Sequence, residues 1–350
     1  MKKILVTGGC GFIGSNFIHY LFNKSIDVEV VNLDNLTYAA NIDNLIGIEP
    51  KFHKHVYGDI CDKKIVKKLF KENKFDYLIN FAAESHVDRS IDNPSQFIKT
   101  NIFGTYTLLE ESLNYMRESE NKDFRFIHIS TDEVYGSLGQ NDLFTEETPY
   151  DPSSPYSSSK ASSDHLVRAW NRTYGLPTII TNCSNNYGSF QFPEKLIPLM
   201  IINCLDEKKL PIYGKGKNVR DWLYVMDHCE AIYKVLINGK IGDTYNIGGN
   251  NEIENIAIVE TICNILDSKV PRENGESYKS LINYVKDRPG HDFRYAIDSS
   301  KIKNELGWTP LESFETGIEK TIDWYLHNKT WWKNIQNNTY SQKRLGVLKS

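Results

Sequence analysis

Three things are missing from the 350-residue sequence, and each absence excludes a class of protein. No apolar run approaches the roughly 20 residues that a membrane-spanning helix needs, and the start of the chain lacks the apolar stretch and small-residue cleavage site of an export signal. The six cysteines lie far apart without a C-x-x-C pair, which argues against a disulfide framework or a zinc site. We therefore expect a cytoplasmic protein with reduced thiols, no membrane partner and no bound metal.

Neither sign of charge dominates the sequence. The 41 Lys and Arg residues face 45 Asp and Glu residues, and the net charge is only −4. This balance gives no basic field that would attract a nucleic acid, so we expect no nucleic-acid partner. Hydrophobic residues make up 40% of the chain, and a globule of this size buries roughly three-quarters of its unfolded surface, so a large core is available.

Short β-branched runs alternate with helical patterns in the first half of the chain. The predicted strands are Lys3–Thr7, Val28–Asp34, Lys54–Asp59, Tyr77–Ala82, Arg125–Ser130 and Pro177–Asn182. Two long helices are predicted between them, from about Pro94 to Met116 and from Pro155 to Tyr174. Strands that are apolar throughout and alternate with helices are typical of an α/β fold with a doubly wound parallel (Rossmann) sheet.

The pattern loosens after residue 184 into shorter helices separated by loops rich in Tyr and Gly. These helices are predicted at Pro193–Leu205, Val225–Ile237, Asn255–Leu266 and Ser313–His327. We expect residues 1–184 to form the Rossmann domain and residues 185–330 a second, smaller mixed α/β domain. Residues 331–350 are polar and poorly patterned, and we expect a fraying tail there.

A glycine-rich segment follows the first predicted strand and opens a helix. Gly9, Gly11 and Gly14 satisfy G-x-G-x-x-G, and Gly8, Gly11 and Gly14 satisfy G-x-x-G-x-x-G. Glycines permit a tight turn and let backbone amides approach a pyrophosphate at the positive end of the helix. A plain glycine turn is the alternative, but the strand before it and the helix after it favour a dinucleotide site.

Asp34 ends the second predicted strand, 20 residues after Gly14. A carboxylate at this position accepts both ribose hydroxyls of adenosine and repels a 2′-phosphate. No Arg or Lys occurs from residue 35 to residue 50, so the sequence indicates NAD rather than NADP. Asp59 and Ile60 end the third strand and can hold adenine, although Asp59 can equally be the N-cap of the next helix.

Tyr156 and Lys160 lie four residues apart in a predicted helix, and so on one helix face. A phenol ordinarily titrates near pH 10, and a neighbouring ammonium makes its anion more accessible as a base. Chance Y-x-x-x-K spacings are common on solvated helices. Behind a dinucleotide-binding half, the spacing favours a redox site instead.

Thr131, Asp132 and Glu133 stand at the carboxyl end of the fifth predicted strand, where open α/β sheets bind ligands. Two adjacent carboxylates can merely cap the next segment. In a cleft, however, like charges push their pKa values apart, as an acid and a base require. A simple alcohol dehydrogenase would not need this hydroxyl, acid and base in addition to Tyr156 and Lys160.

Several motifs together resemble the signature set of the dTDP-glucose 4,6-dehydratases, a family of extended short-chain dehydrogenases. The similarity runs from Met1 to about Tyr325. It rests on segments 8–14, 82–90, 131–136, 156–160, 182–188, 220–222 and 287–292. The wider sugar-nucleotide epimerase family shares the glycines, Tyr156 and Lys160, so the pair Asp132 and Glu133 separates dehydratases from epimerases.

The resemblance implies NAD-dependent dehydration of dTDP-glucose to dTDP-4-keto-6-deoxyglucose, a hydro-lyase reaction of deoxysugar biosynthesis. Tyr156 takes the 4-hydroxyl proton as C4 gives hydride to NAD, with Lys160 beside it. Glu133 then removes the C5 proton, Asp132 protonates the departing 6-hydroxyl, and the hydride returns to C6. Thr131 stabilises the charge that develops at O4.

The resemblance also completes the expected binding sites. The cofactor residues are Gly8, Gly11, Phe12, Ile13, Gly14, Asp34, Asn35, Leu36, Thr37, Asp59, Ile60, Phe81, Ala82, Ala83, Thr100, Tyr156, Lys160 and Asn186. The substrate residues are Ser85, Thr131, Asn185, Lys195, Leu196, Pro211, Tyr213, Arg220, Asn255, Arg288 and His291. Arg220 and Arg288 suit a pyrophosphate, because a guanidinium binds phosphate oxygens bidentately.

Two other functions remain possible, and the oligomeric state is predicted separately below. A UDP-sugar 4-epimerase would keep everything except the carboxylate pair, and a non-catalytic dinucleotide-sensing protein can use the same fold. The sequence does not distinguish thymidine from uridine diphosphate. The two long helices resemble those that pair across a two-fold axis in this family, so we expect a homodimer.

Overall fold

The computed structural model describes residues 1–119, 121 and 123–338. A seven-stranded sheet in the order β10-β6-β5-β4-β1-β2-β3 forms its centre, and all neighbouring strands in it run parallel. The strands are β1 (Lys2–Thr7), β2 (Val28–Asp34), β3 (His53–Tyr57), β4 (Tyr77–Asn80), β5 (Arg125–Thr131), β6 (Thr178–Cys183) and β10 (Thr244–Ile247). The predicted doubly wound parallel sheet is confirmed.

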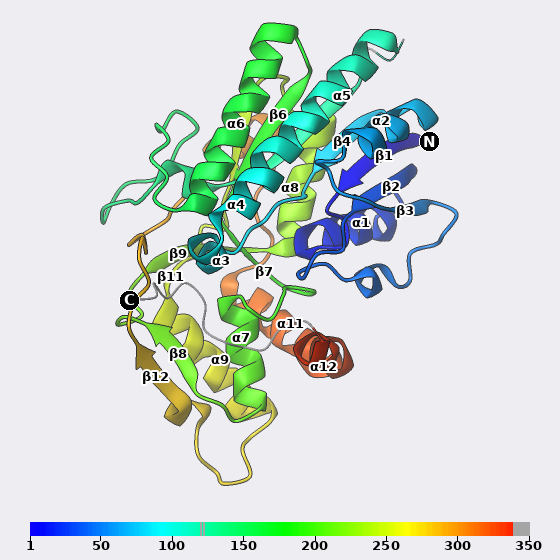
Figure 1. Ribbon diagram of the computed structural model, residues 1–350. Coiled ribbons are helices and arrows are strands. Elements are labelled where there is room, and N and C mark those ends of the chain that lie inside the picture. Colours follow the sequence, from blue (N-terminus) through cyan, green and yellow to red (C-terminus); the bar gives the residue numbers. More distant parts are fainter. Residues whose placement is uncertain (120, 122, 339–350) are drawn as a thin grey trace.

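Helices cover both faces of this sheet (Figure 1). One layer holds α2 (Lys63–Glu72), α5 (Thr105–Glu118) and α6 (Pro155–Tyr174), and the other holds α1 (Phe12–Asn23) and α8 (Val225–Asn238). Residues of β1 alternate between the layers: Ile4 and Val6 pack in the core with α1 and α8, and Leu5 packs with α2, α5 and α6. Burial on both faces explains why the strands are apolar throughout.

The strand order reverses beside β1. The next strands along the chain, β2 and β3, lie on one side of β1, whereas β4, β5, β6 and β10 lie on the other. The loops that leave β1 and β2 therefore diverge from those that leave β4 and β5. Such a reversal opens a crevice at the carboxyl ends of the strands, where ligands bind in open α/β sheets.

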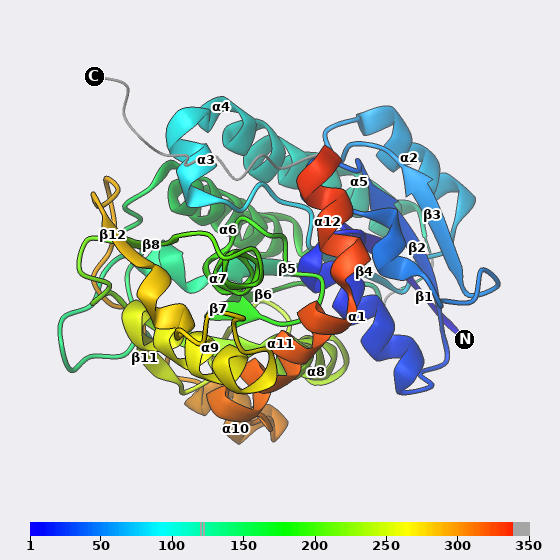
Figure 2. The ribbon, with the colours of Figure 1, turned by 90° about the horizontal axis from the view of Figure 1, so that it is seen from below.

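A second core lies beyond the carboxyl edge of the sheet. Its strands pair as β11-β9-β7 and as β12-β8. Their bounds are β7 (Asn185–Tyr187), β8 (Leu210–Tyr213), β9 (Val219–Tyr224), β11 (Glu252–Glu254) and β12 (Ile282–Val285). Helices α7 (Leu196–Leu205), α9 (Asn255–Lys269) and α11 (Phe314–His327) pack around them. These helices lie below the main sheet in Figure 1, and Figure 2 views the molecule from that side.

The chain returns to the main sheet after residue 184. Strand β10 pairs with β6, and Leu223, Val235 and Ile247 belong to the core that α1 covers. A four-residue strand far from its partner in sequence carries little local pattern, so this return did not show in the sequence. The division at residue 184 stays a prediction about domains, while the sheet itself takes a strand from beyond it.

Two helical segments differ from their predicted form. The predicted helix from Pro94 is helical throughout, but as α4 (Pro94–Phe97), the π-helix η2 (Ile98–Gly104) and α5. The first residues of the expected tail, 331–338, instead belong to helix α12 (Lys329–Asn338). This helix packs on the protein because Trp332 and Ile335 lie three residues apart, on one helix face, and are both buried. The rest of that tail, residues 339–350, lies outside the described residues.

The helices of the described residues include none that is long and apolar enough to cross a membrane. The six cysteines are all free thiols.

Candidate active site

The turn between β1 and α1 forms a cradle that side chains would fill. Gly8 has a left-handed φ of +72°, and a Cβ there would stand 2.7 Å from the Ala82 backbone. A Cβ on Gly14 would stand 2.4 Å from the Gly8 carbonyl oxygen. Helix α1 then begins at Phe12 without a side-chain cap, which leaves its first amides free. This cradle fits a dinucleotide pyrophosphate.

The Asp34 carboxylate is fixed at the end of β2 by backbone amides. Its Oδ2 accepts from the Cys10 amide at 2.8 Å, and its Oδ1 accepts from the Leu36 amide at 2.8 Å. Burial raises the pKa of Asp34, and these two donors oppose the rise. Each carboxylate oxygen keeps a further lone pair for a ribose hydroxyl.

A cavity of about 350 Å³ extends from this cradle to the carboxyl end of β5. Every predicted cofactor residue lines it except Leu36. Leu36 is 38% exposed and has a positive φ of 47°, and its amide is the one that donates to Asp34 Oδ1. Asp59 lines the cavity, and the N-cap of α2 is Asp62, so the capping alternative for Asp59 is wrong.

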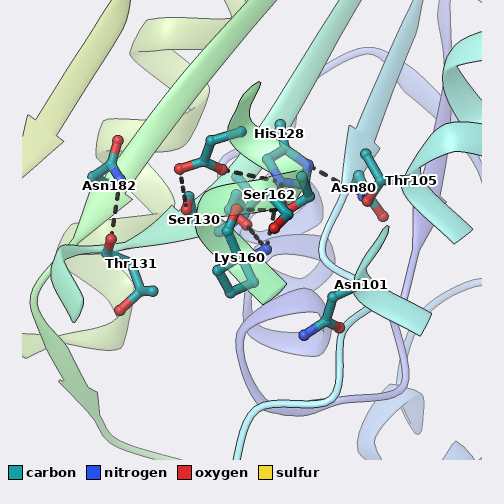
Figure 3. A network of polar contacts seen from close by, with 12 residues as sticks. Asn80, Asn101, Thr105, His128, Ser130, Thr131, Lys160, Ser162 and Asn182 are labelled. Carbon is teal, nitrogen blue, oxygen red and sulfur yellow. Dashed lines mark hydrogen bonds and ion pairs between the residues drawn. The ribbon is translucent and has the colours of Figure 1, made fainter. Parts of the chain in front are cut away.

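The turn after β5 brings the three expected catalytic side chains into the same cavity. The Thr131 hydroxyl accepts from the Glu133 amide at 3.3 Å and caps the short helix η3 (Asp132–Tyr135), and Gly136 ends that helix with a φ of +91°. The same hydroxyl lies 3.3 Å from Asp132 Oδ1. Asn182 donates to the Thr131 carbonyl at 3.0 Å, as Figure 3 shows, and so ties the turn to β6.

The two neighbouring carboxyl groups have unequal surroundings. Asp132 is 1% exposed, and its pKa is raised well above 3.8, first by burial and then by the charges of Glu133 and Asp221. Burial also raises the pKa of Glu133, but Arg288, Lys195 and Arg220 oppose that rise. This asymmetry favours Asp132 as the protonated acid and Glu133 as the ionised base.

Helix α6 presents Tyr156 and Lys160 to the cavity. It begins with Pro155 and a capping box between Ser154 and Ser157, which fixes where its first turn points. Burial and the charge of Glu133 raise the pKa of Tyr156 well above 10, and the Lys160 ammonium donates to the Ile129 carbonyl oxygen at 2.7 Å. Burial and Glu133 therefore outweigh the lowering of the phenol pKa that was expected from Lys160.

A second cavity, of about 510 Å³, adjoins the first. Both are lined by Glu133, Asn185, Glu194, Lys195, Leu196 and Trp222. The second one also collects the remaining expected substrate residues, namely Pro211, Tyr213, Arg220, Asn255, Arg288 and His291, whereas Ser85 and Thr131 line the first. The geometry thus brings all expected substrate residues around one continuous space.

Two arginines and one lysine of the second cavity are oriented by contacts with neighbouring groups. Arg220 Nη2 donates to the Asp292 carbonyl at 2.9 Å, and the guanidinium lies over the Tyr295 ring at 4.1 Å. Arg288 Nε lies 3.5 Å from Asp88 Oδ1, while its buried Nη1 has no hydrogen-bond partner and is available to an anion. Lys195 donates to the Ser85 carbonyl at 2.8 Å, which links the two cavities.

Sequence reasoning missed several residues that line the two cavities. They are mostly charged or aromatic, and include Glu84, Asp88, Glu194, Lys208, Lys209, Trp222 and Tyr295. Glu84 and Asp88 stand inside a segment that the resemblance had already marked, so their neighbourhood was a usable signal. Lys208 and Lys209 carried none, because an ordinary surface turn has the same composition. Among the described residues, no group of three or more His, Cys, Asp or Glu side chains could hold a metal.

Comparisons with known proteins agree with this geometry. A family model described as GDP-mannose 4,6 dehydratase matches residues 5–321. A dTDP-glucose 4,6-dehydratase of Escherichia coli is 56% identical over 361 residues, which cover 99% of each chain. The crystal structure of dTDP-glucose 4,6-dehydratase from Bacillus anthracis in complex with NAD is 48% identical, with a TM-score of 0.85 over 96% of this chain and 100% of that one. The counterpart from Streptomyces venezuelae, also with NAD bound, is 43% identical with a TM-score of 0.87 over 95% and 99% of the two chains. The chain belongs to the dTDP-glucose 4,6-dehydratase family.

Proposed function

We propose that the protein converts dTDP-glucose to dTDP-4-keto-6-deoxyglucose by NAD-dependent loss of water, and so acts as a hydro-lyase. One observation carries the choice of reaction: the neighbouring carboxyl groups of Asp132 and Glu133 line the same cavity as Tyr156 and Lys160. The first pair serves elimination and the second serves oxidation, so a single bound sugar can undergo both.

We assign the proton transfers to side chains by their surroundings. Tyr156 takes the proton of the sugar 4-hydroxyl, and the Thr131 hydroxyl stabilises the charge that develops on that oxygen. Glu133, whose charge is favoured by three nearby cations, removes the C5 proton. Asp132, kept neutral by burial, protonates the departing 6-hydroxyl. Bound NAD supplies an acceptor for the C4 hydride and a donor that returns it to C6.

The linings of the two cavities support the proposed positions of the cofactor and of the substrate nucleotide. The glycine cradle and Asp34 would hold the pyrophosphate and the adenosine ribose of NAD, with Thr37, Asp59 and Ile60 around the rest of that nucleoside. In the second cavity, Arg220 and Arg288 would bind the sugar-nucleotide pyrophosphate. Tyr213, Pro211 and Leu196 would contact the base. Burial lowers the pKa of His291 to about 4, so it would serve this site as a neutral side chain.

A direct experiment separates this function from its alternatives. Purified protein with NAD would be incubated with dTDP-glucose or UDP-glucose, and the product masses measured. We expect a product lighter by one water from dTDP-glucose. A 4-epimerase would give a product of unchanged mass from UDP-glucose, and a dinucleotide-sensing protein would give no product at all. Either of those results contradicts the proposal.

We also propose a homodimer built on the outer faces of η2, α5 and α6. Large side chains stand exposed there: Ile98, Phe103, Tyr106 and Tyr174 are between 42% and 59% exposed. Helices α5 and α6 run side by side at one end of the molecule (Figure 1), so two copies can pack them into a four-helix bundle.

Light scattering should give twice the chain mass of 40.3 kDa. Phe103→Glu with Tyr106→Lys should yield monomers. Leu311→Glu, which changes a 78% exposed leucine elsewhere, should leave the dimer intact. A stable wild-type monomer at micromolar concentration contradicts the proposal.

We place the enzyme in the cytoplasm. The support is chemical: none of the six thiols forms a disulfide, and disulfides are rare in cytosolic proteins. Cell fractionation that recovers the activity with periplasmic markers would contradict this location.

A further inference from the structure

A buried carboxylate lies one helical turn beyond Lys160 and outside both cavities. Asp164 is 0% exposed and shares the inward face of α6 with Lys160, because the two lie four residues apart. Its Oδ2 accepts from the Ser130 hydroxyl at 2.7 Å and from the Tyr150 hydroxyl at 2.9 Å. An acceptor that collects these donors in the interior is stable as an anion, and nearby His128 and Lys160 lower its pKa despite burial.

His128 connects this anion to Lys160. Its Nε2 lies 3.4 Å from Asp164 Oδ1 and 3.5 Å from Lys160 Nζ (Figure 3 shows His128, Ser130 and Lys160 gathered at this point). Burial lowers the pKa of His128 to about 4, so the ring is neutral near pH 7. The neutral ring therefore stands between the two groups without adding a charge of its own.

The tautomer of His128 follows from the groups behind it. The Thr7 hydroxyl donates to Asn80 Oδ1 at 2.6 Å, which turns the Asn80 amide nitrogen toward His128 Nδ1 at 3.2 Å. His128 Nδ1 is then an acceptor, and its proton sits on Nε2. His128 Nε2 then donates to the Ser163 hydroxyl at 3.2 Å, and Asp164 Oδ1 lies 3.4 Å from the same nitrogen without a hydrogen-bond partner of its own.

The groups that face Lys160 leave Asp164 as its counter-charge. Strand β5 presents neutral His128 and the Ile129 carbonyl, and the end of β6 presents Cys183, whose thiol pKa is raised by burial. Helix α6 presents Tyr156 and Asp164. Across the cavity stand Asp132, itself kept neutral by burial, and Glu133, which three other cations already face. Burial lowers the pKa of Lys160, and Asp164 is the strongest opposing influence.

We propose that Asp164 is a positioning residue, whose buried carboxylate keeps the Lys160 side chain an ammonium and holds it against the Ile129 carbonyl. This inference rests on the proposed function in one respect, namely that Lys160 assists the catalytic Tyr156. An ammonium without this counter-charge would lose its proton in so buried a place. The neutral amine could neither stabilise the Tyr156 phenolate nor keep the same hydrogen-bond geometry.

Asp164→Asn tests the proposal, because the amide keeps the shape and one acceptor but removes the charge. The protonation of Lys160 would be followed by NMR with lysine labelled at Cε, and its signal assigned by its loss in Lys160→Arg. The Lys160 titration midpoint should fall by about one pH unit or more in Asp164→Asn. The alkaline limb of the kcat profile should move the same way, with kcat falling more than KM rises.

Asp227→Asn is the matched control. Asp227 is also buried and accepts from the Leu311 and Glu312 amides, away from Lys160. The Asp227→Asn variant should be less stable than the wild type but should keep the same Lys160 titration midpoint. An unchanged midpoint in Asp164→Asn overturns the proposal, even if activity falls. If Asp164→Asn does not fold, the protonation state of Lys160 is measured in the wild-type protein at pH 7.5. A neutral Lys160 amine overturns the proposal, and a protonated ammonium supports it. The NMR readout needs no turnover, so it stands apart from a failure of the proposed reaction.

Discussion

Asp132 and Glu133 are adjacent in sequence and yet suited to opposite tasks. Asp132 is buried near the charges of Glu133 and Asp221, which keeps it neutral, whereas Glu133 lies near Arg288, Lys195 and Arg220. The difference comes from η3, since successive residues of a tight helical turn point in different directions. A pair that the sequence showed only as two carboxylates therefore becomes an acid and a base.

Asp132→Asn combined with Glu133→Gln should separate oxidation from elimination. C4 oxidation needs Tyr156, Lys160 and NAD, whereas water loss needs the acid and the base, so water loss should slow by at least about a hundredfold. Rapid mixing with dTDP-glucose should then show reduced nicotinamide accumulating on the enzyme. Glu319→Gln with Asp323→Asn removes two carboxylates from the surface of α11 and should behave as the wild type. Water loss at the wild-type rate in the first double variant would refute the assigned roles.

The direction of the Tyr156 pKa shift could not be predicted from residue spacing alone. The four-residue interval predicted that Lys160 would lower the phenol pKa, and both side chains do line one cavity. The protein instead raises that pKa, because the phenol is buried next to Glu133. Spacing along a helix gives proximity, but the sign of a pKa shift depends on all charges around the group, and these come from distant segments.

At the scale of elements, the best-predicted segments are those whose local pattern agrees with their packing. Strand β2 (Val28–Asp34) and helix α6 (Pro155–Tyr174) begin and end where the sequence predicted. In β2 an apolar run ends at a charged residue, and α6 carries its own capping box and ends at left-handed Gly175. The π-helix η2 could not be predicted, because its extra residue per turn depends on tertiary contacts such as Asn101 with Ser159.

Helix α12 depends on packing in the same way. Trp332 is 1% exposed, and its indole nitrogen donates to the Tyr325 carbonyl at 3.0 Å. Trp332→Ala should lower the free energy of unfolding by about 3–5 kcal/mol, because it empties a buried site. Asn334→Ala on the exposed side of α12 should change it by about 0.5 kcal/mol or less. Urea unfolding would measure both, and equal effects would mean that the helix is not docked through Trp332.

At the scale of the molecule, two cores meet at one cavity system. The Rossmann sheet and the glycine cradle were predictable, because β-α-β alternation and glycine spacing are local signals. The second cavity was expected only through family resemblance, since Tyr213, Asn255 and Arg288 come from segments with no shared pattern. Its link from Asp88 to Tyr213, at 2.8 Å across 125 positions of sequence, has no local signal at all.

We expect the oxidising groups and the eliminating groups to act on one sugar in one cavity. NAD would then be restored in each turnover, because the hydride taken from C4 returns to C6 of the same molecule. Confinement also keeps the reactive 4-keto intermediate away from side reactions. Both pairs of groups line the cavity that holds the glycine cradle, which places redox and elimination side by side.

The most direct measurement uses dTDP-glucose carrying deuterium at C4. The label would be followed by mass spectrometry and proton NMR after reaction with the purified enzyme and NAD. We expect deuterium at C6 of a product that is lighter by one water, with no net consumption of NAD. Deuterium released into free reduced cofactor, or retained at C4, would contradict this expectation.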